Sequence, residues 1–551
     1  MKKLFLIEIY IMTLILSFAA MSFEVAIVKT LSTLINNSIL AQAITIGVFI
    51  LSLAFGTMLH HYFKKNDQIK TLFTLEILIS ILGSCALFIY IAWVSIYNIF
   101  LSRLVPNIDS AMVYILSAQI PTIIIGSLVG IELPLLILLA ERFKDGRAEA
   151  FVLSANYLGS LLACLVLPLC LFKYFDTVSV AILVSELNCM IAFWAYARSD
   201  WKWKNPRSTI ILIPLGIVFA LFYFDPRLNE YYLKSLYMDY IPSNLSADSI
   251  KNVVKMVENK KPIERILSQY QYIDIVYPGI YKDQDLNANQ PYLFYLDHKL
   301  QWSSKDEHIY HQSMVHGAVD LLGYTPKNVL VLGGGDGLLV RELLLYENID
   351  SIELVEIDQA VVDLSQKNPQ LTNLNKYALH SPKVKIIIDD AFKQLLREKK
   401  KYDIIFIDFP FPNSYEINRL FSVEFYRRIK NALNSEGIAV LDFPLDTLNC
   451  LMSENYKMKH PSHVDIIYST LTEAGFENSI AFGFYDPFIA VRVKKEPKLK
   501  FNFKKLKDNK LLSNSAFVNL RPIGEDCNSP VIKLDYVNSV FRPISLETKE
   551  Q

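Results

Sequence analysis

The chain has 551 residues, and its 55 basic and 55 acidic side chains give a formal net charge of zero. This length predicts more than one domain, and neutral charge without a basic, aromatic-interleaved patch argues against a nucleic-acid-binding protein. The six cysteines have neither metal-ligand nor disulfide-framework spacing, so we interpret them as packing residues.

The first 225 residues hold nearly all of the long apolar runs, although hydrophobic residues make up 52% of the whole chain. A membrane-spanning helix needs about 20 apolar residues, and seven runs are long enough. The first run is too long for a signal-peptide core and is followed by further runs, which argues against a cleaved leader. The predicted spans are Leu4–Val28, Leu40–Leu59, Leu72–Val94, Met112–Leu139, Phe151–Phe172, Thr177–Ala197 and Thr209–Phe224.

The distribution of charge adds two observations on these spans. The basic clusters between spans all fall on one side, which the positive-inside rule assigns to the cytoplasm together with the N-terminus. Seven spans would place the following domain outside, and one span more or fewer would reverse this, so the side of the membrane on which that domain lies stays open.

Four acids lie in or beside spans, where an unpaired carboxylate is costly. They serve either a cation pathway or, as we favour, hydrogen bonds across helices or sites near the membrane surface. These acids are Glu24, Glu76, Glu132 and Glu186.

Residues 226–327 are predicted to form a linker and a small β-hairpin lead-in to a second domain. Tyr270–Tyr277 and Tyr292–Asp297 are typical of short strands, and Asp306–Leu322 has the spacing of a helix.

From Asn328 onward, apolar strands alternate with helical patterns, which predicts a mostly parallel sheet covered by helices on both faces. Ligands of such sheets bind in a crevice at the carboxyl ends of the strands. We therefore predict a nucleoside-binding domain over residues 328–499 and a C-terminal extension over residues 500–551. The predicted strands are Val329–Leu332, Ser351–Glu356, Val384–Ile388, Tyr402–Ile407 and Gly437–Asp442.

Glycines and acids follow these strands where each one ends. The segment Gly333-Gly-Gly-Asp-Gly337 lets the backbone approach a nucleotide-like ligand, and Glu356 lies about 20 residues beyond it, where a ribose diol is usually held. Asp390 and Asp408 end the next two strands. Ordinary structural roles are the alternative, since Asp336 could cap the following helix and Asp390 could begin the next one.

These motifs together resemble the spermidine synthase family, the polyamine aminopropyltransferases, in order and spacing from Tyr270 to Val440. Within the spans, Gly130-Ile-Glu-Leu-Pro-Leu135 and Tyr157-Leu-Gly159 are similar to a bacterial branch that carries an N-terminal membrane region. The matching soluble residues are Tyr270-Gln271, Leu296-Asp297, Leu300-Gln301, Asp306-Glu307, Tyr310-His311, Gly333–Gly337, Glu356-Ile-Asp358, Asp390-Ala391, Tyr402–Asp408, Leu420-Phe421-Ser422 and Phe425-Tyr426.

The resemblance implies a multi-span α-helical membrane domain joined to an α/β Rossmann-like domain of the spermidine synthase and methyltransferase type. It implies an integral protein of the bacterial inner membrane, in contact with lipid, and a homodimer as in related soluble enzymes. The implied reaction transfers the aminopropyl group of decarboxylated S-adenosylmethionine, a co-substrate, to a diamine such as putrescine. No prosthetic group or metal is implied.

Each matched residue has an implied role. The aminopropyl and sulfonium end of the donor would meet Gln271, His311 and Asp336, Glu356 would accept both ribose hydroxyls, and Asp390 with Ala391 would bind the adenine. Gly333 and Gly335 would bring the backbone close to the nucleoside. Asp408 would be the general base and would anchor the acceptor, with Tyr310 and Tyr485 lining the acceptor channel.

Two positions depart from the family pattern. Phe411 stands where a second carboxylate usually follows the base, and Gln312 replaces the acid that commonly follows the Tyr-His pair. Both changes remove negative charge from the acceptor side, so the acceptor stays open. A methyltransferase using the same crevice and a non-catalytic membrane polyamine carrier or sensor remain alternatives to the aminopropyltransferase.

A metal site is the alternative reading of three histidines, His308, His311 and His316. Their spacings of three and five residues on a helix do not share one tight face, and no cysteine joins them. We therefore expect no metal.

Overall fold

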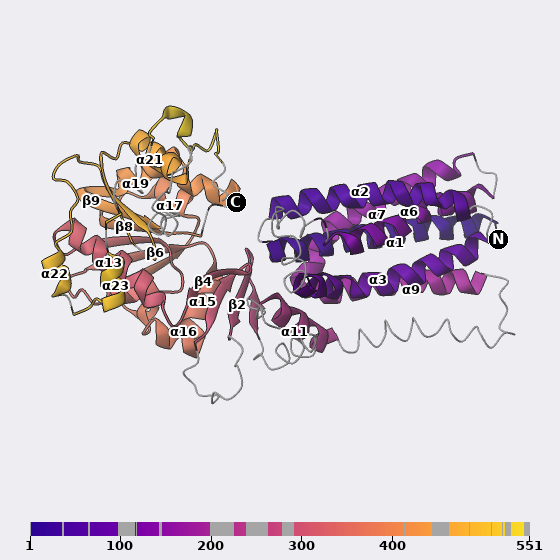
Figure 1. Cartoon of the computed structure of the whole chain (residues 1–551), viewed down its shortest axis with the longest axis horizontal. Coiled ribbons are helices and arrows are strands. Elements are labelled where there is room, and N and C mark those ends of the chain that lie inside the picture. Colours follow the sequence, from indigo (N-terminus) through magenta and orange to yellow (C-terminus); the bar gives the residue numbers. More distant parts are fainter. Residues whose placement is uncertain are drawn as a thin grey trace. The chain divides into compact units, whose positions relative to one another are not determined.

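The computed structural model describes residues 2–35, 38–63, 67–96, 116, 118–142, 146–198, 225–237, 263–277, 291–410, 412, 415–442, 462–483, 485–508, 510–520, 522–523 and 531–544. They form two compact units that divide near Glu264. The first unit is built from long helices and the second from sheets with covering helices (Figure 1).

The long helices confirm six of the predicted spans, because six of them are long and apolar enough to cross a membrane. The seventh predicted span, 209–224, and the beginning of the fourth lie outside the described residues. A shorter helix, α11 (Asp225–Leu236), packs against α9 and α3. The long helices are α1 (Lys2–Ile35), α2 (Ser38–Phe63), α3 (Gln68–Ile96), α6 (Ile120–Glu141), α7 (Ala148–Val166), which continues through η2 (Leu167–Leu171) and α8 (Phe172–Tyr174), and α9 (Thr177–Arg198).

Helices α2 and α6 pack closely because small residues line their interface. A Cβ atom on Gly130 would lie 2.3 Å from the Leu53 carbonyl oxygen, and one on Gly56 would lie 2.0 Å from that of Ser127. Pro134 inside α6 has no N–H to donate to the Gly130 carbonyl. The Thr57 hydroxyl donates to that carbonyl at 3.2 Å instead. The interface therefore satisfies a carbonyl group that α6 itself leaves without a donor.

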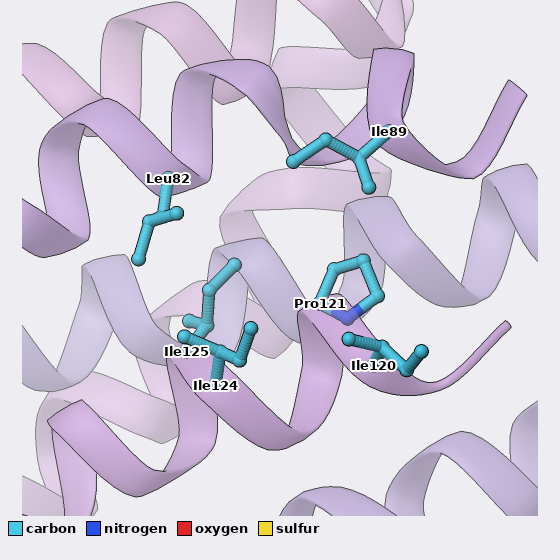
Figure 2. Close-up of a pocket in the computed structure, with 6 residues that line it drawn as sticks. All are labelled: Leu82, Ile89, Ile120, Pro121, Ile124 and Ile125. Carbon is cyan, nitrogen blue, oxygen red and sulfur yellow. The ribbon is translucent and has the colours of Figure 1, made fainter. Parts of the chain in front are cut away.

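Two of the four predicted acids meet inside the helical unit. Glu76 on α3 is fully buried, and Glu132 on α6 is 5% exposed. Neither carboxylate oxygen of Glu76 has a hydrogen-bond partner among the described residues, so the interpretation of hydrogen bonds across helices is not supported for Glu76. A hollow between the same two helices has only apolar lining side chains and offers no polar group to a nucleoside (Figure 2). Its lining residues are Leu82, Ile89, Ile120, Pro121, Ile124 and Ile125.

The second unit contains two sheets. The predicted hairpin belongs to a four-stranded sheet of order β1-β2-β3-β4, with β1 (Glu264–Leu267), β2 (Tyr272–Val276), β3 (Leu293–Leu296) and β4 (Lys299–Ser303). The larger sheet has the order β10-β11-β9-β8-β5-β6-β7. Its strands are β5 (Asn328–Gly333), β6 (Ser351–Glu356), β7 (Val384–Ile388), β8 (Tyr402–Asp408), β9 (Leu433–Asp442), β10 (Asn478–Phe482) and β11 (Phe488–Arg492).

The five predicted strands are confirmed and run parallel, which establishes the α/β class. Strands β10 and β11 were not predicted, and they extend the sheet antiparallel beyond β9.

Helices cover both faces of the large sheet, and the strands alternate accordingly. In β5, Leu330 and Leu332 belong to one apolar core, while Val329 and Val331 belong to the other. The first core includes α17 (Ala391–Arg397), α19 (Val423–Ala432) and α21 (His463–Ala474). The second includes α13 (Glu307–Leu322) and α14 (Leu338–Leu343).

The C-terminal segment packs into the same domain. Leu506 of α22 (Phe503–Lys507) and Leu520, which follows α23 (Asn514–Asn519), are buried in the second core. The buried Asn538 amide donates to the side-chain oxygen of Asn418 at 2.9 Å. Residues predicted as an extension thus contribute to the core that supports the sheet.

Candidate active site

The glycine loop after β5 lies directly against two of the predicted acids. Gly333, Gly334 and Gly337 have φ angles of 84°, 67° and 79°, a region that favours glycine. A Cβ atom on Gly334 would lie 3.0 Å from Asp408 Oδ2, and one on Gly335 would lie 2.8 Å from Glu356 Cγ. The loop therefore adopts its path because side chains are absent from it.

Asp408 is the last residue of β8, and it pairs in register with Gly333 at the end of β5. The Tyr310 hydroxyl, from α13, donates to Asp408 Oδ1 at 2.8 Å. The pKa of Asp408 is raised to about 6. Burial is the main cause and the negative charge of Asp336 adds to it, while His311 and the Tyr310 hydrogen bond lower the pKa. This moves a carboxylate toward the range in which a general base works well near neutral pH.

His311 is held by a buried ion-pair network. Its Nδ1 lies 2.7 Å from the Glu307 carbonyl oxygen and 2.9 Å from Glu307 Oε2. Two N–H groups of Arg341 donate to the same carboxylate at 2.8 and 3.0 Å. Burial alone would lower the pKa of His311, but the hydrogen bond with Glu307 and the charges of Asp336, Glu307 and Asp408 raise it to about 9. His311 is thus a cation beside the acids of the site.

Asp336 follows the glycines, and both of its carboxylate oxygens have protein partners. Oδ2 accepts from Trp302 Nε1 at 2.8 Å, and Oδ1 accepts from the Leu338 N–H at 3.0 Å. The second contact corresponds to the alternative structural role, in which Asp336 binds an N–H group at the beginning of the following helix, α14. The first joins the small sheet to the glycine loop and orients the carboxylate.

Glu356, at the end of β6, accepts backbone N–H groups from Gly335 at 3.1 Å and Asp358 at 3.0 Å. Burial raises its pKa to about 7, against these hydrogen bonds. The Gln271 amide, expected beside Asp336, instead donates to Asp358 Oδ2 at 3.1 Å. Gln271 therefore lies at the β6 end of the site.

Asp390 caps α17, since its Oδ1 accepts from the Phe392 N–H at 2.8 Å, and its other oxygen pairs with Arg419. Burial would raise the pKa of Asp390, but the Arg419 contact outweighs it and lowers the pKa. Ala391 is buried immediately after it.

Two of the remaining predicted residues, Tyr485 and Gln312, contact the C-terminal segment. Tyr485 is 55% exposed, and its backbone N–H donates to Asn519 Oδ1 at 2.7 Å. Phe411 lies outside the described residues. Gln312 Oε1 accepts from the Ser513 N–H at 2.9 Å, so it binds the C-terminal segment.

The three histidines have separate partners. His308 contacts Ser515 Oγ at 3.3 Å, His311 contacts Glu307, and His316 contacts the Tyr346 hydroxyl at 2.7 Å.

Three features of the site were not predicted: the Glu307–Arg341 pair, Asp442 and Asp486. Asp442 ends β9 as Asp408 ends β8, so the pattern of acids at strand ends could have identified it. Nothing in the sequence marked Asp486, because it precedes a strand that was not predicted.

A glycine loop after β5, with acids in that loop and at the ends of β6 and β8, is typical of the nucleoside-binding class of α/β proteins. A family model described as Spermine/spermidine synthase domain matches residues 307–460. The polyamine aminopropyltransferase of Oceanobacillus iheyensis is 30% identical over 433 residues, covering 77% of this chain and 75% of that protein. That of Leptospira interrogans is 29% identical over 440 residues, covering 78% of both chains.

The chain belongs to the polyamine aminopropyltransferase family. This confirms the predicted enzyme class, with decarboxylated S-adenosylmethionine as co-substrate and an amine as acceptor. Among solved structures, a spermidine synthase in complex with the transition state analogue AdoDATO aligns with 46% of this chain and 83% of its own. The identity in that alignment is 22%, and the TM-score is 0.37.

Proposed function

We propose that Asp408 is the general base of aminopropyl transfer in this chain, with the donor held over the glycine loop. The observation that carries the proposal is the convergence on that loop of Asp408, whose pKa is raised to about 6, and Glu356. Asp336 would face the sulfonium, Glu356 the ribose and Asp390 the adenine. Gln271, His311 and Ala391 complete the proposed donor site.

The reaction requires an amine that has lost its proton, because only the free lone pair attacks carbon. An aliphatic amine has a pKa of about 10, so a positioned base contributes roughly 10²–10⁴ in rate. The nitrogen forms a bond to the aminopropyl carbon, the bond from that carbon to sulfur breaks, and the sulfur keeps the electron pair. The products are methylthioadenosine and the lengthened amine, and the proton passes to Asp408. Tyr310 positions this carboxylate through its hydroxyl.

The test is turnover by the full-length protein purified in detergent. Decarboxylated S-adenosylmethionine and a diamine should yield methylthioadenosine, and Asp408→Asn should reduce the rate at least 10²-fold. Asp350→Asn is the matched control, because Asp350 is exposed and precedes β6. It therefore lies at the amino end of that strand, away from the carboxyl ends that carry the site. Methyl transfer from intact S-adenosylmethionine without aminopropyl transfer would contradict the proposal.

The second part of the proposal concerns location and assembly. The six apolar helices suggest membrane association, and we propose that they span the inner membrane of a bacterium in contact with its lipid. Retention of the protein in the membrane fraction after alkaline carbonate washing tests this. The proposed homodimer rests on the resemblance to soluble enzymes, and native mass spectrometry of the detergent-purified protein tests it.

A further inference from the structure

Trp302, on β4 of the small sheet, contacts the site through its indole N–H, which the proposed reaction does not use. This N–H donates to Asp336 Oδ2 at 2.8 Å, and the Trp302 side chain is only 7% exposed. An indole N–H is a donor only, so a buried one requires an acceptor. The acceptor here is a carboxylate, and a hydrogen bond to a charged group is stronger than one between neutral groups.

Aromatic packing fixes the direction of that N–H. The Trp302 ring stacks on the Phe294 ring, with 5.0 Å between centroids and 5° between planes. Tyr292 lies edge-on to the same indole, with 5.9 Å between centroids and 71° between planes. Contacts with two rings in different orientations restrict rotation of the indole, so its N–H keeps one direction.

The remaining polar atoms of Asp336 are fixed as well. The Leu338 N–H donates to Oδ1 at 3.0 Å, and the Asn375 amide donates to the Asp336 backbone carbonyl at 2.9 Å. The backbone and both carboxylate oxygens therefore each have a protein donor. An ionised carboxylate has about four acceptor positions, so the two hydrogen bonds to its oxygens leave about two for a ligand.

The orientation of Asp336 matters because a protein cation also interacts with it. Burial alone would lower the pKa of His311, but the hydrogen bond with Glu307 and nearby charges, including that of Asp336, raise it to about 9. A carboxylate free to rotate would be drawn toward this cation. Hydrogen bonds to both oxygens oppose such rotation, and a carboxylate already in place does not reorganise when a cationic ligand binds.

The donor and its product differ in charge at the end that Asp336 would face. Decarboxylated S-adenosylmethionine carries a sulfonium and also an ammonium group, since an aliphatic amine has a pKa of about 10. Methylthioadenosine has a neutral sulfur and no such amine, while its adenine and ribose are the same. An oriented carboxylate therefore stabilises the bound donor and contributes little to binding of the product.

We propose that Trp302 is a positioning residue that orients the Asp336 carboxylate, and that this orientation makes the site bind the cationic donor in preference to uncharged methylthioadenosine. The inference rests on the proposed function, in which Asp336 faces the sulfonium. Trp302 acts through Asp336 rather than on the reacting atoms. Since transfer removes the positive charge from sulfur, the same contact loses its effect once the product has formed, and fresh donor displaces the product.

Calorimetry with the full-length protein in detergent measures both affinities, and without an amine there is no turnover. Trp302→Phe keeps an aromatic ring on Phe294 but removes the N–H. The Kd of decarboxylated S-adenosylmethionine should rise about 10-fold in this variant, whereas that of methylthioadenosine should change less than about 2-fold. Equal losses for the two ligands, or an unchanged Kd of the donor, would overturn the proposal.

Tyr292→Phe is the matched control within the same aromatic cluster. It removes a buried hydroxyl that donates to the Gln370 carbonyl at 3.1 Å instead of to Asp336. Both Kd values should stay within about 2-fold of those of the unchanged protein. A loss of donor affinity equal to that of Trp302→Phe would assign the effect to packing of the small sheet and contradict the proposal.

A double-mutant cycle with Asp336→Asn tests whether Trp302 acts through this carboxylate. Adding Trp302→Phe to Asp336→Asn should change the Kd of the donor less than about 2-fold, because the charge that the N–H orients is absent. A further loss of about 10-fold would overturn the proposal. If the unchanged protein bound neither ligand, the proposed donor site would fail together with this inference. If it bound both but turned over no amine, only the role of Asp408 would fail.

Discussion

Replacing Glu307 by Gln should destabilise the enzyme domain in a pH-dependent way. The Glu307 side chain is only 4% exposed and accepts from His311 and from two N–H groups of Arg341. Neutralising it leaves two buried cations without their shared partner. Breaking a buried ion pair in this way costs about 3–5 kcal/mol. For a domain of this size, each kcal/mol lowers the Tm by about 2–4 °C, so the expected loss is roughly 6–20 °C.

The pH dependence of stability follows from the shifted pKa values of His311 and Glu307. The pKa of His311 is raised to about 9, so its contribution is complete below its ordinary value of 6.5 and is lost as pH rises through 9. Glu307, although buried, has its pKa lowered to about 2 by His311 and Arg341. Its contribution is complete above its ordinary value of 4.5 and is lost as pH falls through 2. The window of greatest stability from this pair therefore lies between about pH 4.5 and 6.5.

Thermal unfolding monitored by circular dichroism in detergent, from pH 6 to pH 9.5, measures the effect. The unchanged protein should lose about 3 kcal/mol across this range through His311, since each pKa unit is worth about 1.4 kcal/mol. Glu307→Gln should start lower and change less. Asp363→Asn removes an exposed pair with Lys367 and should cost less than about 1 kcal/mol at every pH. Parallel pH curves for the unchanged protein and Glu307→Gln would refute the reasoning.

Two further predictions concern the glycine loop and the base. Gly334→Ala should reduce kcat/KM at least 10-fold, because the new methyl group would lie 3.0 Å from Asp408 Oδ2. Gly323→Ala is its control, since Gly323 also has a positive φ but open space around it, and activity equal to that control would contradict the claim. In Tyr310→Phe, the loss of a hydrogen bond that lowers the pKa of Asp408 should move the acidic limb of kcat/KM upward from about pH 6. If the acidic limb of kcat/KM stayed at the same pH in Tyr310→Phe, the assigned effect of Tyr310 on the pKa of Asp408 would be contradicted.

Sequence patterns predicted the parallel strands well because both of their faces are buried. Such strands are continuous apolar runs, as in Tyr402–Asp408, and they end abruptly in acid. The acids beside the glycine loop were predicted for the same reason, since the carboxyl ends of parallel strands meet at one edge.

Other parts of the site depend on contacts between distant segments, which local patterns do not encode. The Gln271 amide reaches Asp358 rather than Asp336 because the small sheet sets its position. Strand β11 is short and fully buried, and the sequence pattern did not distinguish it from the segments around it. The turn before it depends on Asn519, more than 30 residues further along the chain.

The Asn519 contacts also tie the C-terminal part of the chain to the turn before β11. The glycine loop and the acids beside it come from the middle of the polypeptide, whereas the turn before β11 is fixed by its C-terminal part. Substitution of Asn519 would therefore remove the hydrogen bonds that hold this turn without changing the strands that carry Asp408 and Glu356.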